Sequence, residues 1–162
     1  MVELHPLCKP LAPLLGTWRG SGAGSYPTIE DFDYSEELIF GHVGKPFLSM
    51  GQRTRDASTG QPLHAETGYL RALPDGAVEF TVAQPSGVVE IDVGSVAETS
   101  DGLVVELESA QVGLTPSAKS VTAVRRRLHL AGETLVSELW MAAVGEADLI
   151  HHVRAELSQQ GS

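Results

Sequence analysis

Short turn signals divide most of this chain into runs of residues that alternate between apolar and polar. The turn signals are Pro74-Asp75-Gly76, Ser86-Gly87, Ser100-Asp101-Gly102 and Ala131-Gly132-Glu133. Gly, Pro, Asp and Ser favour tight turns, and alternation with a period of two is typical of a strand with one buried face. Each signal therefore predicts a β-hairpin with antiparallel flanking strands, and the chain as a whole is expected to be all-β.

The alternating runs predict about ten strands. We place them at residues 17–24, 34–42, 47–56, 63–73, 77–84, 88–98, 103–109, 120–130, 134–143 and 149–157. Serial hairpins form either a two-sheet sandwich or an up-and-down barrel, and we favour the barrel because closure leaves no exposed sheet edge. A barrel of about ten strands is wider than its own side chains fill, so it is expected to enclose a ligand cavity.

The residues before Gly16 predict a short helical cap on one end of this barrel. Leu11, Leu14 and Leu15 are apolar, while prolines such as Pro13 prevent a long helix. Glycines at every second position of the following strand indicate a sharp bend or a close approach by another backbone or a ligand. Trp18, in the same strand, is interpreted as packing that closes the barrel end.

Length, charge and cysteine content limit the function classes. The chain has 162 residues, which fits one domain spanning 1–162. A formal net charge of −10 with 11 Lys and Arg residues argues against nucleic-acid binding. The one basic run, Arg125-Arg126-Arg127, is interpreted as a solvated strand face. Cys8 is alone, and no signal peptide or membrane-spanning stretch is visible, so we expect a cytoplasmic protein without a membrane partner.

Candidate chemistry is concentrated in the histidines. The sequence contains no nucleophile elbow, no phosphate-binding glycine loop and no zinc-ligand spacing. His151 and His152, which open the last predicted strand, and His64 are the strongest candidates among the six histidines. Zinc requires three or four convergent ligands, whereas haem needs only one axial imidazole and an apolar pocket. A hollow barrel with one functional histidine therefore suits haem better than zinc.

Several segments together resemble the nitrobindin family, and the resemblance extends over nearly the whole chain. They are Leu14-Leu15-Gly16-Thr17-Trp18-Arg19-Gly20-Ser21-Gly22, Leu63-His64-Ala65-Glu66-Thr67-Gly68-Tyr69-Leu70-Arg71, Ala83-Gln84-Pro85-Ser86-Gly87 and the His-Val-x-Ala-x-Leu ending. The resemblance implies a ten-stranded antiparallel barrel, similar to lipocalins and fatty-acid-binding proteins, that holds one ferric haem b near its mouth. It also implies binding of nitric oxide and isomerisation of peroxynitrite to nitrate.

The same resemblance implies a set of haem-site residues. By position, His152 matches the axial ligand of the iron. His64, Met141 and Gln84 correspond to residues that line the haem pocket. Lys119 and Thr28 lie in family-like segments and are expected on the propionate side of the haem.

Strand parity and family position disagree about the axial ligand. Parity places His151 on the same face as Val153, Ala155 and Leu157, so an apolar-inside rule selects His151. The family ending places its ligand immediately before the apolar position that Val153 occupies, which selects His152. The spacing from Met141 is one residue longer than is usual in the family, so we expect a bulge or insertion in residues 145–148.

Other interpretations remain open from the sequence alone. The same barrel could carry a fatty acid or another hydrophobic ligand without catalysis, or serve as a haem-based sensor. For the carrier, interior Arg or Tyr groups would be expected to hold a carboxylate. His64 could instead be a strand histidine bonded to Glu66, and a homodimer is possible.

Overall fold

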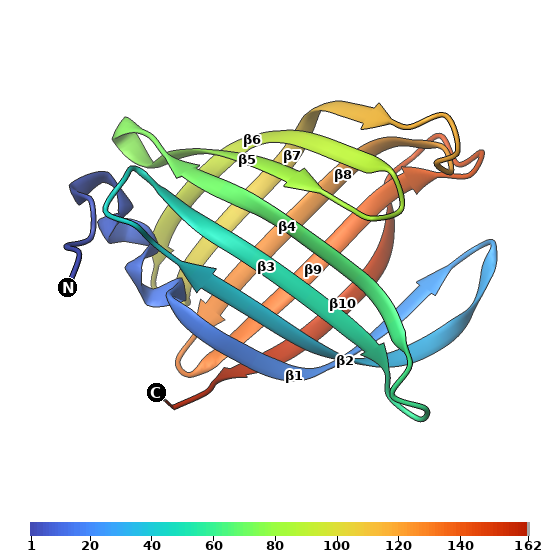
Figure 1. The fold of residues 1–162 in the computed structure, drawn as a ribbon, viewed down its shortest axis with the longest axis horizontal. Helices are drawn as coiled ribbons and strands as arrows, with labels where there is room; N and C mark the ends of the chain where they lie inside the picture. Colours follow the sequence, from blue (N-terminus) through green and yellow to red (C-terminus); the bar gives the residue numbers. More distant parts are fainter. Residues whose placement is uncertain (162) are drawn as a thin grey trace.

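In the computed structural model, which describes residues 1–161, the chain forms a closed barrel of ten antiparallel strands. Each strand pairs with the next in sequence, and β10 pairs with β1 to close the ring (Figure 1). The strands are β1 (Gly16–Tyr26), β2 (Ile29–Gly41), β3 (Phe47–Asp56), β4 (Pro62–Ala72), β5 (Ala77–Ala83), β6 (Val88–Thr99), β7 (Gly102–Leu114), β8 (Val121–Ala131), β9 (Thr134–Ala143) and β10 (Ile150–Gln159). The predicted up-and-down barrel is confirmed, and the alternative sandwich is wrong.

Some strands are longer than the alternation predicts. β2 begins at Ile29, five residues before the expected position, and β7 continues to Leu114. The first part of β2 is mostly exposed and carries Glu30, Asp31 and Asp33, so it has no buried face for a pattern to mark. Its strand conformation comes instead from pairing with the end of β1, which cannot be seen in a single segment.

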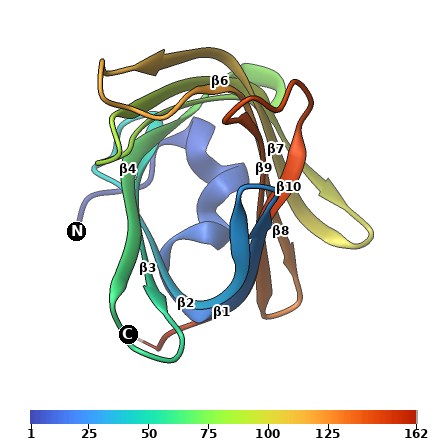
Figure 2. The same ribbon diagram turned by 90° about the vertical axis from the view of Figure 1, so that its right-hand side faces the viewer.

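A 3₁₀ helix, η1 (Pro6–Leu14), closes one end of the barrel as predicted. Figure 2 shows it through the ring of strands. Leu11 and Leu14 are fully buried against the core, and the indole N–H of Trp18 donates a hydrogen bond of 2.8 Å to the carbonyl of Leu14. Trp18 is 2% exposed, so its predicted packing role at this end is confirmed. A second short 3₁₀ turn, η2 (Pro74–Gly76), connects β4 and β5.

The glycines of β1 permit a close approach of β10. A Cβ atom at Gly20 would lie 1.9 Å from the backbone carbonyl oxygen of Glu156. At Gly22 it would lie 2.5 Å from the ring of Tyr34. Only glycine fits positions with so little space, so these residues are required for barrel closure.

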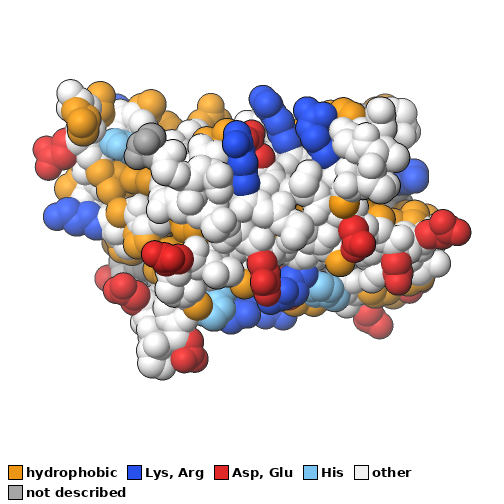
Figure 3. All heavy atoms as spheres, turned by 90° about the horizontal axis from the view of Figure 1, so that it is seen from below, with side chains coloured by type: hydrophobic (Ala, Val, Ile, Leu, Met, Phe, Trp, Pro, Cys, Tyr) orange, Lys and Arg blue, Asp and Glu red, His pale blue; other side chains and the backbone are white. Residues whose placement is uncertain are grey.

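The outer surface is mixed in character. Figure 3 shows acidic, basic and hydrophobic side chains interspersed on one face of the molecule. Outward ion pairs include Arg19 with Glu37 and Arg71 with Glu79. Within residues 1–161, no helix has the length and apolar character needed to cross a membrane.

Candidate functional site

The half of the barrel opposite η1 contains a cavity of about 710 Å³. Its walls are mainly apolar and include Leu38, Phe40, Met50, Leu70, Phe80 and Leu107. The loops between β1 and β2, β5 and β6, β7 and β8, and β9 and β10 lie around its mouth. This volume is within the range of small-molecule and cofactor sites, so the predicted ligand cavity is present.

A β-bulge places His152 in the cavity wall. His151 pairs with Trp140 and Val153 pairs with the next residue, Leu139, so His152 is an extra residue in β10. The bulge shifts the parity of the strand, and both His152 and Val153 line the cavity. The bulge lies at His152 and not in residues 145–148, where the chain makes the β9–β10 turn with left-handed backbone at Val144 and Gly145. A loop insertion relative to the family stays a prediction.

His151 lies on the outside of the barrel. Its ring is exposed, packs edge-on against Trp140 and contacts the Glu138 carboxylate at 3.0 Å through Nε2. The apolar-inside rule that selects His151 therefore fails at this position. It fails because the rule assumes regular alternation, which the bulge interrupts.

The imidazole of His152 is held in a defined orientation. Nδ1 lies 2.9 Å from the backbone carbonyl oxygen of Ser25, and the ring packs edge-on against Tyr26 and Phe32. A carbonyl oxygen can only accept a hydrogen bond, so Nδ1 carries the proton in this contact. In the neutral ring, Nε2 therefore keeps its lone pair for a ligand. Hydrogen bonding of one ring nitrogen to a carbonyl is the usual arrangement for a metal-binding histidine.

The surroundings of His152 also favour its neutral form. Burial lowers the pKa of the imidazole, and the nearby His64 and His151 lower it further. The hydrogen bond to the Ser25 carbonyl acts in the opposite direction but does not reverse the shift. A neutral imidazole is the form that binds a metal ion.

The other predicted site residues are placed as follows. Met141 and Gln84 line the cavity, and Lys119 lies at its mouth with an exposed side chain. His64 also lines the cavity, and its Nε2 is 3.4 Å from a carboxylate oxygen of Glu66, the contact considered as an alternative role. Thr28 is exposed in the β1–β2 turn, where the lining residue is its neighbour Ile29. The structure thus brings most of the predicted set together around one cavity, with Thr28 and His151 outside its lining.

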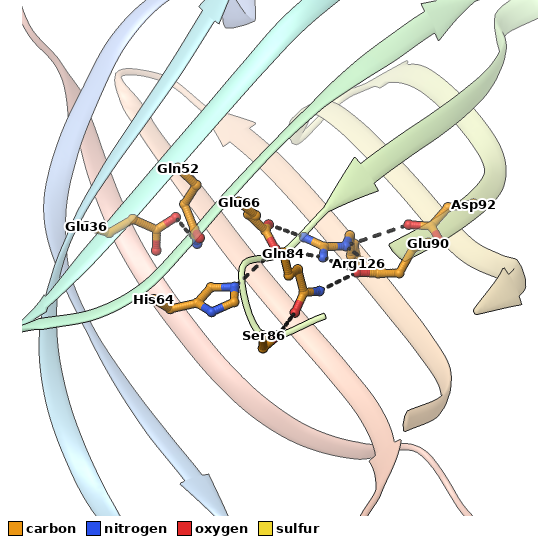
Figure 4. A network of polar contacts seen from close by, with 9 residues as sticks. All are labelled: Glu36, Gln52, His64, Glu66, Gln84, Ser86, Glu90, Asp92 and Arg126. Carbon is orange, nitrogen blue, oxygen red and sulfur yellow. Dashed lines mark hydrogen bonds and ion pairs between the residues drawn. The ribbon is translucent and has the colours of Figure 1, made fainter. Parts of the chain in front are cut away.

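A buried polar network crosses the barrel interior beside His64 (Figure 4). Arg126, from β8, donates two hydrogen bonds to Glu66, of 2.5 and 3.0 Å, and two to Glu90, of 2.7 and 3.2 Å. Asp92 lies 3.6 Å from Nε of the same guanidinium. The interpretation of Arg125-Arg126-Arg127 as a solvated face is therefore wrong for Arg126, although it holds for its two outward neighbours.

Glutamine side chains extend the network on both sides. The Gln52 amide donates to Glu36 at 3.2 Å, and the Gln84 amide donates to Glu90 at 2.6 Å. Glu36, Glu66 and Arg126 all line the cavity. The network is therefore part of the cavity wall as well as of the barrel core.

The acidic groups of the network differ strongly in their affinity for protons. Burial would raise the pKa of Glu66, but Arg126 and His64 hold it at about 2. Burial raises the pKa of Glu36 to about 7, with only the Gln52 amide as hydrogen-bond partner. Burial and the neighbouring Glu90 raise the pKa of Asp92 to about 7. Glu66 thus keeps its negative charge at neutral pH, while Glu36 and Asp92 take up a proton more readily than ordinary carboxyls.

This network was missed by the sequence analysis because its strand reverses the usual pattern. On β6, Val89, Ile91 and Val93 are 46 to 50% exposed, whereas Glu90 and Asp92 are 1% and 0% exposed. The available signal was the parity of the arginines: in regular strands, Arg126 must face opposite to Arg125 and Arg127. An isolated inward arginine requires inward carboxylates, and the acids of β6 provide them.

Comparison with known proteins identifies the family. The model of the "THAP4-like, heme-binding beta-barrel domain" matches residues 7–159. The chain belongs to this family. Peroxynitrite isomerase 1 of Mycolicibacterium paratuberculosis is 51% identical over 158 residues, which cover 98% of each chain. The peroxynitrite isomerase of Nocardia farcinica is 51% identical over 156 residues, covering 96% of this chain and 92% of the relative.

A solved structure of the same family has the same fold. The crystal structure of Rv2717c from M. tuberculosis matches with a TM-score of 0.94 and 48% sequence identity, covering 98% of this chain and 100% of that one. The resemblance to nitrobindins is therefore confirmed over the whole barrel. As a member of the family, the chain is a haem-binding barrel.

The residues of the cavity fit a haem. The macrocycle requires apolar walls and one imidazole with a lone pair, and the cavity provides both. The Lys119 ammonium at the mouth is suited to a carboxylate such as a haem propionate. His64 and Gln84 supply polar groups deeper in the wall.

Proposed function

We propose that this chain, as a single domain, binds one haem b through Nε2 of His152 and isomerises peroxynitrite to nitrate. The observation that carries the proposal is the hydrogen bond from His152 Nδ1 to the Ser25 carbonyl, which directs the lone pair of Nε2 away from the backbone. The names of the relatives, which share about half of their residues with this chain, support the reaction.

Bound haem would supply an iron with one open position, which is a Lewis acid for an anionic peroxide oxygen and a site for nitric oxide. The isomerisation breaks the O–O bond of peroxynitrite and forms a new N–O bond, with no net gain of protons or electrons. The chain would orient the haem and enclose the reacting anion. His152 would hold the iron through Nε2, and the apolar walls around Met141 and Phe40 would exclude water from the reacting anion.

Lys119 has a separate role in this proposal. It is an exposed cation at the mouth of a cavity in an acidic protein, so it attracts anions toward the opening and is placed to pair with a propionate. Thr28, in the opposite rim, is proposed to contact the same edge of the haem through its exposed hydroxyl.

The carrier interpretation lacks its expected feature. Arg126 is the interior arginine that could hold a fatty-acid carboxylate, but its N–H groups are already bonded to Glu66 and Glu90. A fatty acid would therefore have to displace an internal ion pair. No observation within the described residues favours this function over haem binding.

The experiment that tests the proposal is haem titration followed by absorption spectroscopy. We expect the wild type to give a Soret band and to convert peroxynitrite to nitrate in stopped-flow measurements. His152→Ala should lose both, whereas the matched variant His151→Ala, changed on the outer surface, should retain both. Retention of the Soret band in the double variant, which carries both His151→Ala and His152→Ala, would contradict the assignment of the axial ligand to this pair. The homodimer expected from the sequence stays a prediction, which sedimentation would test.

A further inference from the structure

The interior of the barrel carries more negative than positive groups. Within the described residues, four buried carboxyl groups surround one guanidinium: Glu36, Glu66, Glu90 and Asp92 around Arg126. Their exposed fractions are 7% or less. Buried charges are normally paired, and one arginine cannot neutralise four acids. The interior is therefore a region of negative potential whenever these groups are ionised.

The contacts show which two acids receive no hydrogen bond from Arg126. Glu66 and Glu90 take the N–H groups of Arg126. Glu36 receives one neutral amide N–H from Gln52. Neither carboxylate oxygen of Asp92 has a hydrogen-bond partner within residues 1–161, and its nearest cationic atom is 3.6 Å away. Glu36 and Asp92 are thus the two acids whose negative charge is compensated least, and we refer to them as the uncompensated pair.

Charged and polar groups on several strands lie near these two carboxyls. Tyr34 lies on the same strand as Glu36, while Gln52 faces it from β3, His64 and Glu66 from β4, and Arg126 from β8. Asp92 is affected by Glu90 on its own strand and by Glu66 and Arg126. Glu66 and Glu90 oppose ionisation of the pair and Arg126 favours it. The pKa values of about 7 result from this balance together with burial.

Glu36 and His152 line the same cavity. A cation held by His152 would therefore share the cavity with the Glu36 carboxyl, while Asp92 lies behind the cavity wall beside Arg126. A ferric haem core carries one more positive charge than a ferrous one. Ionised carboxylates in the same enclosure stabilise the more positive state, and net charge is one of the means by which proteins tune a redox centre.

We propose that Glu36 and Asp92 set the reduction potential of the bound iron and couple its reduction to uptake of a proton. This inference rests on the proposed haem site at His152. In the coupled step, one electron from an external donor reduces the iron, and one proton from solvent converts a carboxylate of the pair into a carboxylic acid. The charge of the enclosure is then unchanged, which is why the two events are linked.

The test is the reduction potential of the haem-loaded protein, measured by spectroelectrochemistry from about pH 5 to pH 9. In the wild type the potential should fall as the pH rises through the pKa of the pair, about 7. At pH 8, Glu36→Gln should shift the equilibrium toward the ferrous state by about tenfold, which is about 59 mV for one electron. The variant should also flatten the pH dependence.

Glu37→Gln is the matched control. Glu37 is the next residue of β2, on the outer face, where it pairs with Arg19 at 2.6 Å. Its removal changes the net charge of the protein equally but leaves the interior intact, so the potential should stay at the wild-type value. An equal shift in both variants would overturn the proposal, because it would show a general charge effect.

Asp92→Asn is a second, independent variant should Glu36→Gln fold poorly. It should raise the potential at pH 8 in the same direction as Glu36→Gln. Loss of the infrared band of a protonated carboxyl near neutral pH provides a readout in the haem-free protein. Unchanged potentials in both interior variants, with an intact Soret band, would overturn this inference alone. Absence of haem binding in the wild type would overturn the proposed function and this inference with it.

Discussion

The two halves of the barrel are built from the same alternating strands, but only the cavity half adds buried charged groups to its apolar walls. At the end closed by η1, the inward side chains are apolar. Among Leu11, Leu14 and Trp18, only Trp18 has a polar side-chain atom, and its N–H donates a hydrogen bond to the Leu14 carbonyl. In the cavity half, the inward side chains include Arg126 and its four acidic neighbours. Apolar burial stabilises the fold by about 1.5 to 3 kcal/mol for each large side chain, whereas buried charge is costly unless it is paired.

The contrast separates the closed end from the half of the barrel that contains the candidate site. The closed end is filled with apolar side chains, whereas the cavity half contains open space and acids with few partners. Natural sequences depart from consistent local rules mainly at functional sites. The four predictions below test this division, beginning with the largest expected effect.

Replacing Arg126 with Met should destabilise the protein by about 3 to 5 kcal/mol at pH 7, because it leaves buried carboxylates without their cation. Urea unfolding followed by circular dichroism measures the effect. The control is Arg125→Met, on the outer face beside Trp140, which should cost under about 1 kcal/mol. Equal losses in the two variants would show that the interior network is not a special feature of the cavity half. At pH 5 the loss for Arg126→Met should be smaller, since more of the acids are then neutral.

Replacing Leu14 with Ala should cost about 2 to 5 kcal/mol through the cavity left beneath Trp18. The loss should be nearly the same at pH 5 and pH 8, because Leu14 and Trp18 carry no group that titrates in this range. Leu7→Ala, on the same 3₁₀ helix but 36% exposed, is the control and should have a small effect. A strongly pH-dependent loss for Leu14→Ala would mean that the two halves of the barrel are not energetically separate.

Glu36 should make stability depend on pH. Its pKa is about 7 in the folded protein and near 4.5 when unfolded, so the folded state binds more protons between these values. The stability it contributes is present below about pH 4.5 and is lost as the pH rises through about 7. Denaturant unfolding across this range should show a loss that Glu36→Gln reduces by about 2 kcal/mol. An unchanged slope in the variant would exclude Glu36 as the titrating group.

The smallest effect is expected at the rim of the cavity. Val144 has a φ of +51°, a conformation that is strained for a β-branched residue. Val144→Gly should therefore raise the free energy of unfolding by about 0.5 to 1 kcal/mol, as a shift in Tm measures. Val93→Gly, at an equally exposed position in extended β6, should instead lower it. A destabilised Val144→Gly would argue that its side chain packs productively at the mouth.

The turn chemistry and alternation of single segments were sufficient to predict the architecture. Each predicted hairpin turn lies between two strands of the structure, and the closing role of Trp18 follows from its position in β1. The same reasoning placed most of the candidate residues around one cavity, with Thr28 displaced by one position from the lining residue Ile29. These features depend on neighbours in sequence, which is why they can be predicted.

The interior network and the orientation of the histidine pair could not be predicted in this way. Val89 and Ile91 face outward while Glu90 faces inward, because the pairing of β6 with β5 and β7 overrides hydrophobicity on that strand. Arg126, which neutralises the inward acids, comes from a strand far away in the chain. A buried ion pair is a property of two segments together, so neither segment shows it alone.

The sequence by itself determined a closed ring of hairpins with a capped end, because turns and alternation are local and leave few other arrangements. Only the tertiary structure decided which side chains face the cavity. A one-residue bulge directs His152 inward and leaves His151 outside, and such a bulge is defined by the partner strand opposite it rather than by its own residues. Strand parity is exact over short distances and is reset by each irregularity, so the identity of the inward residues depends on the complete register of the barrel.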